Sequence, residues 1–215
     1  MSIKKVCYFV VVSLMLSACG GGGGGGDSAS SSSTTTTTTS TPSSSSSVTT
    51  PTVDLSGKTR VVDASGVEGL TYECQSTKAT TSQGGVFNCI AFPIAFFLGS
   101  IPLGSVSEVN DDIIYTTDLL NQARGAAHHP DVTKVSMLLQ TLDSDQNPAN
   151  GIQITEANSD LANQYFYADT NLSTISLEDF EATLQDIVNE NKKLSLVNAK
   201  DAQDNLTTAL ASETN

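Results

Sequence analysis

The stretch Gly69-Leu-Thr-Tyr-Glu-Cys74, followed by Gly85-Val-Phe-Asn-Cys89, decides the fold of this chain. In both pieces apolar or aromatic residues alternate with polar ones, as in β-strands that bury one face. Residues 75–84 between them are rich in Ser, Thr and Gly, which is typical of a turn region. If the two pieces pair antiparallel, Cys74 and Cys89 face each other across the hairpin. The stretch therefore predicts a β-hairpin closed by a disulfide.

Strand-like sequence continues on both sides of this stretch. The runs are rich in Val, Ile, Phe, Tyr and Thr and are separated by glycines. They lie at residues 59–63, 67–76, 85–92 and 94–106. A small antiparallel β-sandwich or barrel is expected over residues 56–107. Residues 109–120 are compatible with either extended chain or helix.

The period of the apolar residues changes to that of helices in the second half of the chain, residues 108–212. Four apolar stripes with helical spacing are expected, at residues 131–142, 154–168, 176–188 and 202–210. Asp131 is the expected N-cap of the first, Thr155 lies near the start of the second, and Ser176 with Asp179 resembles a capping box. Strands followed by a bundle of three to four helices packed on them define an α+β fold.

The N-terminus has the pattern of an export signal, with a basic start and an apolar stretch, 6–16, that is too short to span a bilayer. It ends in Leu16-Ser-Ala-Cys19, which resembles the lipobox of bacterial lipoproteins. The resemblance implies that the signal peptide comprises residues 1–18 and that Cys19 carries lipid on its sulfur and an acyl chain such as palmitate on its amine. The alternatives are an ordinary signal peptide with an incidental cysteine and an uncleaved anchor, which the short apolar stretch and the glycines after it disfavour.

A lipid on Cys19 would hold the chain to a membrane stably, because two or more acyl chains are involved. Gly20, rather than Asp, follows the cysteine, and in the lipoprotein family this implies sorting to the outer membrane. Residues 19–55 are a Gly/Ser/Thr-rich low-complexity segment that cannot build a core. We expect a disordered tether there, either unmodified or glycosylated as a stalk.

Of the four cysteines, Cys7 would leave with the signal and Cys19 would be lipidated. In an exported protein the remaining pair, Cys74 and Cys89, is expected to form a disulfide. Closing a loop of about 15 residues is worth roughly 3 kcal/mol in the chain-entropy model. A reactive or metal-binding thiol pair is the alternative, but the chain offers neither a CxxC spacing nor a histidine near these cysteines.

The chain is acidic and contains no tryptophan. Its formal net charge is -13, and removal of Lys4 and Lys5 with the signal would take it to -15. Such a charge argues against binding nucleic acid through a basic patch. No nucleic-acid partner is therefore expected.

A candidate calcium loop lies between the first two predicted helices. Asp143, Asp145 and Asn147 keep the spacing of the first three oxygen ligands in a helix-flanked calcium loop, and Ile152 and Glu156 keep its final four-residue step. Two extra residues before the glycine depart from that pattern. The alternative is a purely structural loop with a helix cap, a tight turn and a first-turn acid.

The adjacent pair His128 and His129 is the only histidine cluster, and a zinc site would need further nitrogen or sulfur ligands. A solvent-exposed pair ahead of a helix is the simpler interpretation. The sequence also shows no serine-nucleophile elbow and no phosphate-binding loop. We therefore expect a protein that is not an enzyme, with a hydrolase whose site is unrecognised as the alternative.

Most of the folded region resembles a domain common in surface-exposed proteobacterial lipoproteins and adhesin-like proteins, a largely uncharacterised group. The resemblance is carried by residues 67–74, 85–89, 96–104, 138–154 and 195–206. Relatives often have His in place of Asn205, and their turn glycines near 78–82 are absent here. The resemblance implies an architecture and a location, but no reaction.

Together these features predict a non-catalytic, membrane-tethered lipoprotein of the outer membrane that acts in adhesion or another envelope interaction. Its partner would be a surface protein or glycan. The alternative is an accessory or chaperone-like lipoprotein of a secretion or pilus system. An exposed apolar groove would favour that alternative, and a polar pocket holding His128 or His129 would favour a hydrolase.

Overall fold

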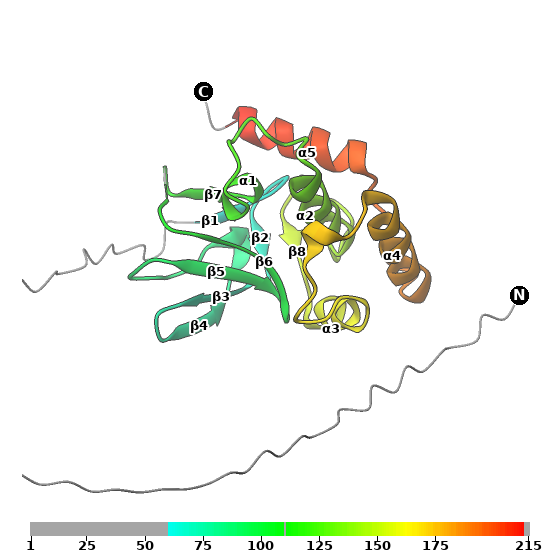
Figure 1. Ribbon diagram of the computed structural model, residues 1–215, viewed down its shortest axis with the longest axis horizontal. Coiled ribbons are helices and arrows are strands. Elements are labelled where there is room, and N and C mark those ends of the chain that lie inside the picture. Colours follow the sequence, from blue (N-terminus) through cyan, green and yellow to red (C-terminus); the bar gives the residue numbers. More distant parts are fainter. Residues whose placement is uncertain (1–59, 110, 213–215) are drawn as a thin grey trace, which may run out of the picture. The chain divides into compact units, whose positions relative to one another are not determined.

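The computed structural model describes residues 60–109 and 111–212. The chain divides into two units, residues 1–47 and 48–215, and all the described residues belong to the second (Figure 1). The expected signal peptide, Cys19 and the expected tether at 19–55 lie outside the described residues.

The largest sheet has four antiparallel strands in the order β4-β3-β5-β6 (Figure 1). The strands are β3 (Thr71–Cys74), β4 (Thr77–Thr80), β5 (Ile94–Leu98) and β6 (Ile101–Val106). Alternate residues of β5 are buried, and in β6 Ile101, Leu103 and Val106 are buried, so one face of the sheet packs on the core. The predicted small antiparallel β-structure is thus confirmed.

The predicted hairpin between residues 69–74 and 85–89 is wrong. Strand β3 pairs instead with β4, which is formed by residues expected to be a turn, and with β5. The connection from β3 to β4 needs only Gln75 and Ser76, and Gln75 adopts a positive φ of 49°. Residues 86–92 form no strand, although Val86 makes one isolated bridge to Arg60.

Two short parallel pairs join the first half of the chain to the second. Strand β1 (Arg60–Val62) pairs with β7 (Ile113–Tyr115), and β2 (Val67–Glu68) pairs with β8 (Ile152–Gln153). The segment 109–120 thus contains both expected alternatives, because β7 runs directly into the short helix α1 (Thr116–Leu119).

All four predicted helical stripes form helices. They are α2 (Pro130–Thr141), α3 (Glu156–Tyr165), α4 (Leu177–Glu190) and α5 (Ala199–Ser212), with short 3-10 turns η1 (Gln83–Gly85) and η2 (Leu172–Thr174). A four-stranded antiparallel sheet followed by these helices confirms the α+β class.

The cap expected at Ser176 is confirmed, and Thr155, expected near the start of its helix, also acts as a cap. Thr155 accepts a hydrogen bond from the Asn158 main-chain N–H at 3.2 Å, and Ser176 accepts one from that of Asp179 at 3.1 Å. The prediction of Asp131 as the first cap is wrong. His129 is the N-cap instead. Pro130 is the first residue of the helix, a position that suits proline because its nitrogen carries no hydrogen and needs no acceptor.

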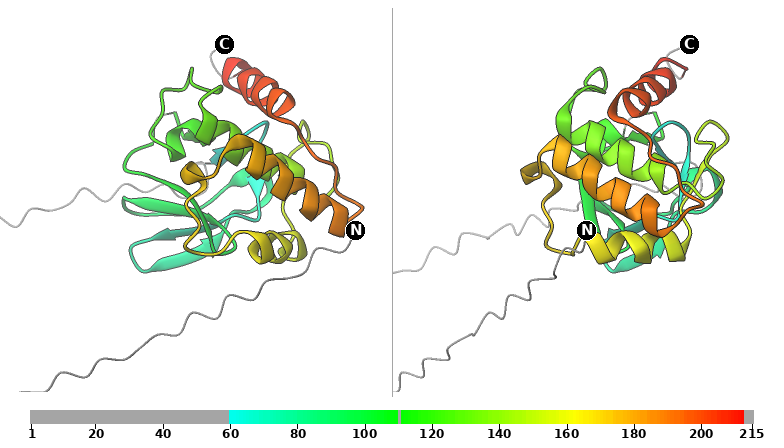
Figure 2. Two further views of the ribbon diagram at one scale, coloured as in Figure 1. Left: turned by 45° about the vertical axis from the view of Figure 1, so that its right-hand side comes forward. Right: turned by 90° about the vertical axis from the view of Figure 1, so that its right-hand side faces the viewer.

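Helix α2 lies at the centre of the helical layer, between the sheet and the other helices (Figures 1 and 2). Every residue from Val132 to Thr141 is buried, and α2 packs against both α4 and α5. The sequence predicts one apolar stripe on this helix. The structure also buries its polar face, which must therefore find hydrogen-bond partners inside the protein.

The main core joins the sheet to the helices. Tyr72, Phe87 and Phe96 form an aromatic cluster on the sheet side, with Phe87 and Phe96 edge to face at 5.3 Å. Phe166, directly after the C-terminal end of α3, stacks on Phe180 in the first turn of α4, with ring centres 5.2 Å apart. The predicted β-segment and helical segment therefore share one hydrophobic core.

Two glycines allow main-chain segments to approach each other closely. Gly69 has a φ of 93°, and a Cβ there would lie 2.1 Å from the Ile154 carbonyl oxygen. Gly104 has a φ of 152°, and its Cβ would lie 2.1 Å from the Leu119 carbonyl oxygen. Only glycine fits both the conformation and the space, so these positions fix how closely β8 and α1 pack on the sheet strands.

Candidate functional site

The candidate calcium loop connects the end of α2 to β8. Its two ends are tied together, because the Ser144 N–H donates to the Gln153 carbonyl and the Gln153 N–H donates to Asp143 Oδ1, both at 2.9 Å. The Ile152 N–H donates to the Gly66 carbonyl at 3.0 Å, and Ser65 Oγ donates to the Pro148 carbonyl at 2.5 Å. The loop is thus held on the segment between β1 and β2.

Asp143 forms the inner wall of this loop. The residue is 0% exposed, and its Oδ2 atom is buried without a hydrogen-bond partner. Burial raises the pKa of the Asp143 carboxyl above its usual range, and the neighbouring Asp145 carboxylate raises it further. A buried carboxylate with an unpaired oxygen is costly to fold unless something else neutralises it.

Asp145 forms the outer side of the same loop and is exposed to solvent. Its carboxylate accepts hydrogen bonds from the side-chain amide of Asn150 and from the main-chain N–H of Asn147, both at 3.0 Å. The hydrogen bond from Asn150 is the main cause that lowers the pKa of Asp145. The structure therefore brings Asp143, Asp145 and Asn147 together in one short loop, as the spacing predicts.

Glu156 lies apart from this arrangement, at the first position of α3, where an acid is favoured by the helix dipole. Among residues 60–109 and 111–212, no group of three or more His, Cys, Asp or Glu side chains could hold a metal ion. Asp143 and Asp145 are thus not joined by Glu156 in such a group. Further oxygen ligands would have to come from Asn147, the main chain or water.

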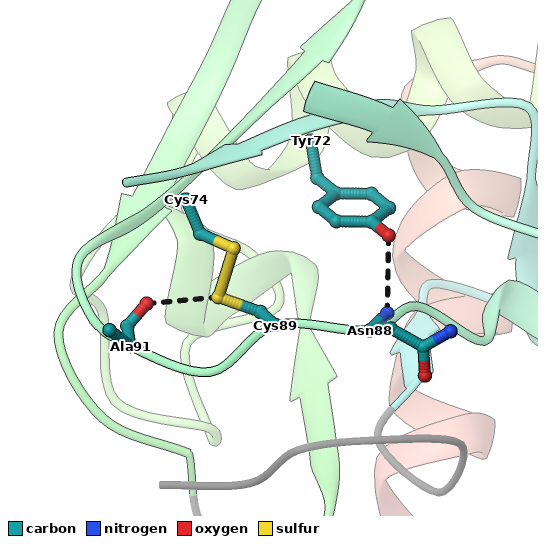
Figure 3. Close-up of a disulfide and its surroundings, with 5 residues drawn as sticks. All are labelled: Tyr72, Cys74, Asn88, Cys89 and Ala91. Carbon is teal, nitrogen blue, oxygen red and sulfur yellow. Dashed lines mark hydrogen bonds between the residues drawn. A yellow bond between two sulfur atoms is a disulfide. The ribbon is translucent and has the colours of Figure 1, made fainter. Parts of the chain in front are cut away.

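The predicted disulfide between Cys74 and Cys89 is confirmed, although its setting differs from the expected hairpin (Figure 3). It links the end of β3 to the extended segment after η1, across a Cα–Cα distance of 6.2 Å. Beside it, the hydroxyl of Tyr72 accepts a hydrogen bond from the Asn88 N–H at 3.2 Å. The disulfide thus holds a segment that has no strand partner of its own.

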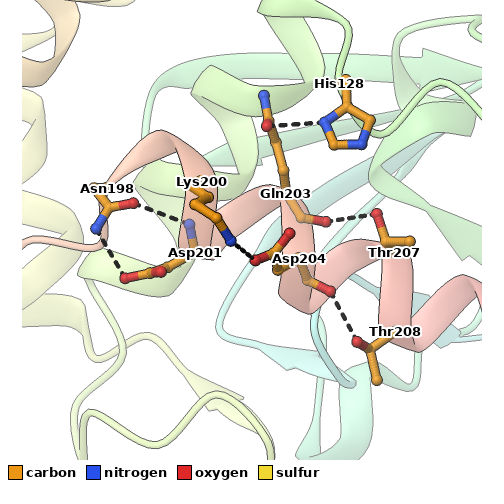
Figure 4. A network of polar contacts seen from close by, with 8 residues as sticks. All are labelled: His128, Asn198, Lys200, Asp201, Gln203, Asp204, Thr207 and Thr208. Atoms are coloured by element: carbon orange, nitrogen blue, oxygen red, sulfur yellow. Dashed lines mark hydrogen bonds and ion pairs between the residues drawn. The ribbon is translucent and has the colours of Figure 1, made fainter.

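Each histidine contacts a helix: His128 contacts a side chain of α5, and His129 caps the start of α2. His128 lies 2.9 Å from Gln203 Oε1 on α5 (Figure 4). His129 accepts from the Asp131 N–H at 3.3 Å as the cap of α2. Figure 4 also shows Asn198 and Asp201, which exchange hydrogen bonds at the start of α5. These contacts assign structural roles to both histidines.

A pocket of about 400 Å³ lies between β7, the segment after α1 and the C-terminal half of α5. Its apolar lining comes from Ile113 and Tyr115 on β7, Ala127 before α2, and Leu210 on α5. Neither histidine lines it. Sequence patterns missed this pocket because its walls come from segments almost one hundred residues apart, with no shared motif.

Arg124 covers one side of this pocket. Its guanidinium lies 4.9 Å from the centre of the Tyr115 ring and donates to the Ile113 carbonyl at 3.1 Å. It also pairs with Asp111 at 3.3 Å and with Asp118 at 3.5 Å. These contacts hold the guanidinium against the pocket wall.

The sequence also missed a buried carboxylate, Asp63, at the end of β1. It is 0% exposed and accepts hydrogen bonds from Thr116 at 2.5 Å, and from Ser136 and Gln140 at 2.6 Å. Burial raises its pKa above the usual range, and these hydrogen bonds oppose that rise. Gln140 in turn accepts from Asn205 on α5 at 2.8 Å, so one network joins β1, α1, α2 and α5.

None of the described helices is long and apolar enough to cross a membrane. The described residues form an α+β domain that contains a disulfide, an apolar pocket beside α5 and a loop that carries two carboxyl groups. No family model, curated protein or solved structure compared with the chain matches it.

Proposed function

We propose that this chain is a lipid-anchored protein of the bacterial cell envelope whose folded domain binds a partner without catalysing a reaction. The lipobox-like Cys19 supplies the anchor, and residues 19–55 supply the tether to the outer membrane. The observation that carries the binding role is the apolar pocket between β7 and α5.

The size and lining of this pocket support binding rather than a packing defect. Its volume of about 400 Å³ falls in the range of ligand pockets, which are apolar with a few polar groups at the edge. Leu210 and Ala211 supply the accessible apolar surface, the buried Tyr115 forms the floor, and Arg124 supplies the polar edge. Such a pocket fits one or two apolar side chains of a partner protein.

The disulfide supports the envelope location. Disulfides persist in oxidising compartments and are rare in the cytosol. Cys74 and Cys89 are 2% exposed and join the sheet to a segment that contributes Phe87 to the core. A domain that depends on this link fits an exported protein.

The same pocket also favours the accessory alternative. An apolar pocket on a tethered domain would let the protein hold an apolar segment of a client of a secretion or pilus system. The two roles differ in which protein is bound and not in the site. Surface proteolysis of intact cells separates them, because complete protection of the domain would remove the adhesion role.

The anchor is tested by changing Cys19 to Ser in the full chain. We expect the protein to move from the membrane fraction to the soluble fraction and to lose label from radioactive palmitate. A Cys19→Ser protein that stays in the membrane fraction would contradict the lipid anchor.

The pocket is tested by filling it. A Cβ on Gly125 would meet no atom within 4 Å, so Gly125→Leu can place a side chain in the pocket without a clash. Thr207 also lines the pocket, and Thr207→Glu adds a charge to it. We expect either change to weaken binding of the apolar dye 1-anilinonaphthalene-8-sulfonate about 5-fold or more, a loss of about 1 kcal/mol.

Thr208→Glu is the matched control. Thr208 is the next residue on α5, is exposed like Thr207 and makes the same hydroxyl contact to a carbonyl four residues earlier, but it does not line this pocket. Envelope proteins captured by the wild-type chain should be retained by Thr208→Glu and lost by Gly125→Leu. Equal capture by all three chains would contradict a role for the pocket.

A further inference from the structure

We propose that the loop from Asp143 to Gln153 binds a calcium ion, with Asp143 and Asp145 as its charged ligands and Asn147 as a neutral one. The site goes beyond the partner-binding role. It shares no residue with the pocket between β7 and α5.

The first support is the unpaired oxygen of Asp143. Oδ1 of Asp143 accepts the Gln153 N–H, but Oδ2 is buried and has no partner. Buried carboxylate oxygens are normally paired, because removing their water without a replacement is costly. An ion at this position would supply the missing contact.

Several main-chain donors near Asp143 bind other acceptors. The Ser144 N–H donates to the Gln153 carbonyl, the Asn147 N–H to Asp145, and the Asn150 N–H to the Asn147 carbonyl. The Asn147 N–H also interacts with the Asp143 carboxyl, yet Oδ2 of Asp143 keeps no hydrogen-bond partner. A bound cation would supply one.

The second support is the juxtaposition of two carboxylates. Asp145 lies two residues after Asp143 in the same loop, and hydrogen bonds from the Asn147 N–H and the Asn150 side-chain amide fix its carboxylate. Two carboxylates in one short loop repel each other, and a cation between them removes that repulsion. Because Asp145 is exposed while Asp143 is buried, the ion would reach Asp143 from the solvent side.

The ligand chemistry points to calcium. The loop offers carboxylate, amide and carbonyl oxygens and contains neither His nor Cys, which zinc and copper prefer. Calcium accepts six to eight oxygen ligands in flexible arrangements, including main-chain carbonyls and water. An exported domain also meets about millimolar calcium, so a weak site would be filled there.

The test is thermal unfolding and calorimetric titration of the full chain after calcium has been removed with a chelator. Calcium chloride should raise the Tm by roughly 5 to 10 °C at 100 times its Kd, because it binds only the folded state. Magnesium chloride at the same ionic strength is the control and should give a much smaller shift. Equal midpoints in calcium and in chelator would overturn the proposal, and so would equal shifts with both salts.

Two variants locate the site. Asp145→Asn removes an exposed charge, so the fold is retained, and we expect calcium affinity to fall at least about 10-fold. Asn147→Asp adds a charged ligand and keeps the main-chain hydrogen bonds of residue 147, so affinity should rise. Unchanged affinity in both variants would overturn the proposal.

Asp160→Asn is the matched control, because it removes one exposed carboxylate from α3, outside the loop. It should leave the calcium response as in the wild type. Glu156→Gln should also leave it unchanged, and a loss of response there would overturn the proposed ligand set. Dye binding in the apolar pocket should be unaffected by these variants, so failure of the calcium site and failure of the pocket are distinguishable.

Discussion

At the scale of single residues, the buried carboxylate of Asp63 accepts four hydrogen bonds. Thr116, Ser136 and Gln140 donate to it from two helices, and the Ala64 N–H donates at 2.9 Å. It is therefore the point at which β1, α1 and α2 are joined by polar contacts. Removing its oxygens would leave several buried donors unpaired.

We expect Asp63→Ala to destabilise the protein by at least about 3 kcal/mol, since each unpaired buried donor costs about 1 to 3 kcal/mol. Asp63→Asn should cost less, because its amide oxygen still accepts and the hydroxyls of Thr116 and Ser136 can turn to accept from its NH₂ group. Urea unfolding at pH 7 measures both. An Asp63→Ala protein as stable as the wild type would contradict this role.

The pH dependence of Asp63 follows from its raised pKa. A carboxyl with a raised folded-state pKa favours folding when protonated, and this contribution is lost as pH rises through that pKa. The stability of the wild type relative to Asp63→Asn should therefore increase as pH falls from 7 toward 4. A constant difference would show that the carboxyl does not titrate in this way.

At the scale of elements, the contact between α2 and η2 depends on a buried lysine. Lys134 is 2% exposed and donates to the carbonyls of Leu172 and Ile175 at 2.6 and 3.0 Å. Asp131, one turn earlier on α2, pairs with it at 2.9 Å. The hydrogen bond from Lys134 lowers the pKa of Asp131 below its usual range.

We expect Asp131→Asn to reduce stability at pH 7 by roughly 1 to 3 kcal/mol, the range for a hydrogen bond to a charged group. Because the folded-state pKa of Asp131 is lowered, its contribution is present above the ordinary pKa and is lost as pH falls through the lowered one. The stability difference between the wild type and Asp131→Asn should therefore shrink as pH falls below the ordinary carboxyl pKa of 3.8. Urea unfolding at pH 7, 4 and 2 checks this, and a difference as large at pH 2 as at pH 7 would contradict it.

The elements also show what sequence patterns can and cannot predict. The helices were predictable because the apolar period of a helix, and caps such as Thr155 and Ser176, are local features. The strand predicted at residues 85–92 is wrong for a physical reason. Phe87, Cys89 and Ala91 are buried while Asn88 and Ile90 are exposed, so the chain is extended and alternates without a strand partner.

Some features of the candidate site were likewise predictable from local sequence, and others were not. The spacing of Asp143, Asp145 and Asn147 predicted their proximity, because all three lie in one short loop. The burial of Asp143 and the position of Glu156 depend on how α3 and β8 pack, which spacing does not encode. Asp63 and the apolar pocket join distant segments, so no local pattern could reveal them.

At the scale of the whole molecule, the disulfide links strand β3 of the sheet to the segment around Cys89, which pairs with no strand. We expect the double change Cys74→Ser and Cys89→Ser to lower the free energy of unfolding by about 3 kcal/mol, as for a closed loop of about 15 residues. Denaturant unfolding with and without a reductant measures it. A wild-type protein that is equally stable when reduced would contradict this contribution.

The two parallel strand pairs have a consequence for the order in which the protein folds. Strands β3 to β6 can pair with near neighbours in the chain, but β1 and β2 must wait for partners roughly 50 and 85 residues further on. If the chain is exported N-terminus first, its four-stranded sheet can form before either parallel pair closes. β1 would be secured only after residue 115 has emerged and β2 only after residue 153, so a prematurely terminated chain would leave its first strands open to proteases.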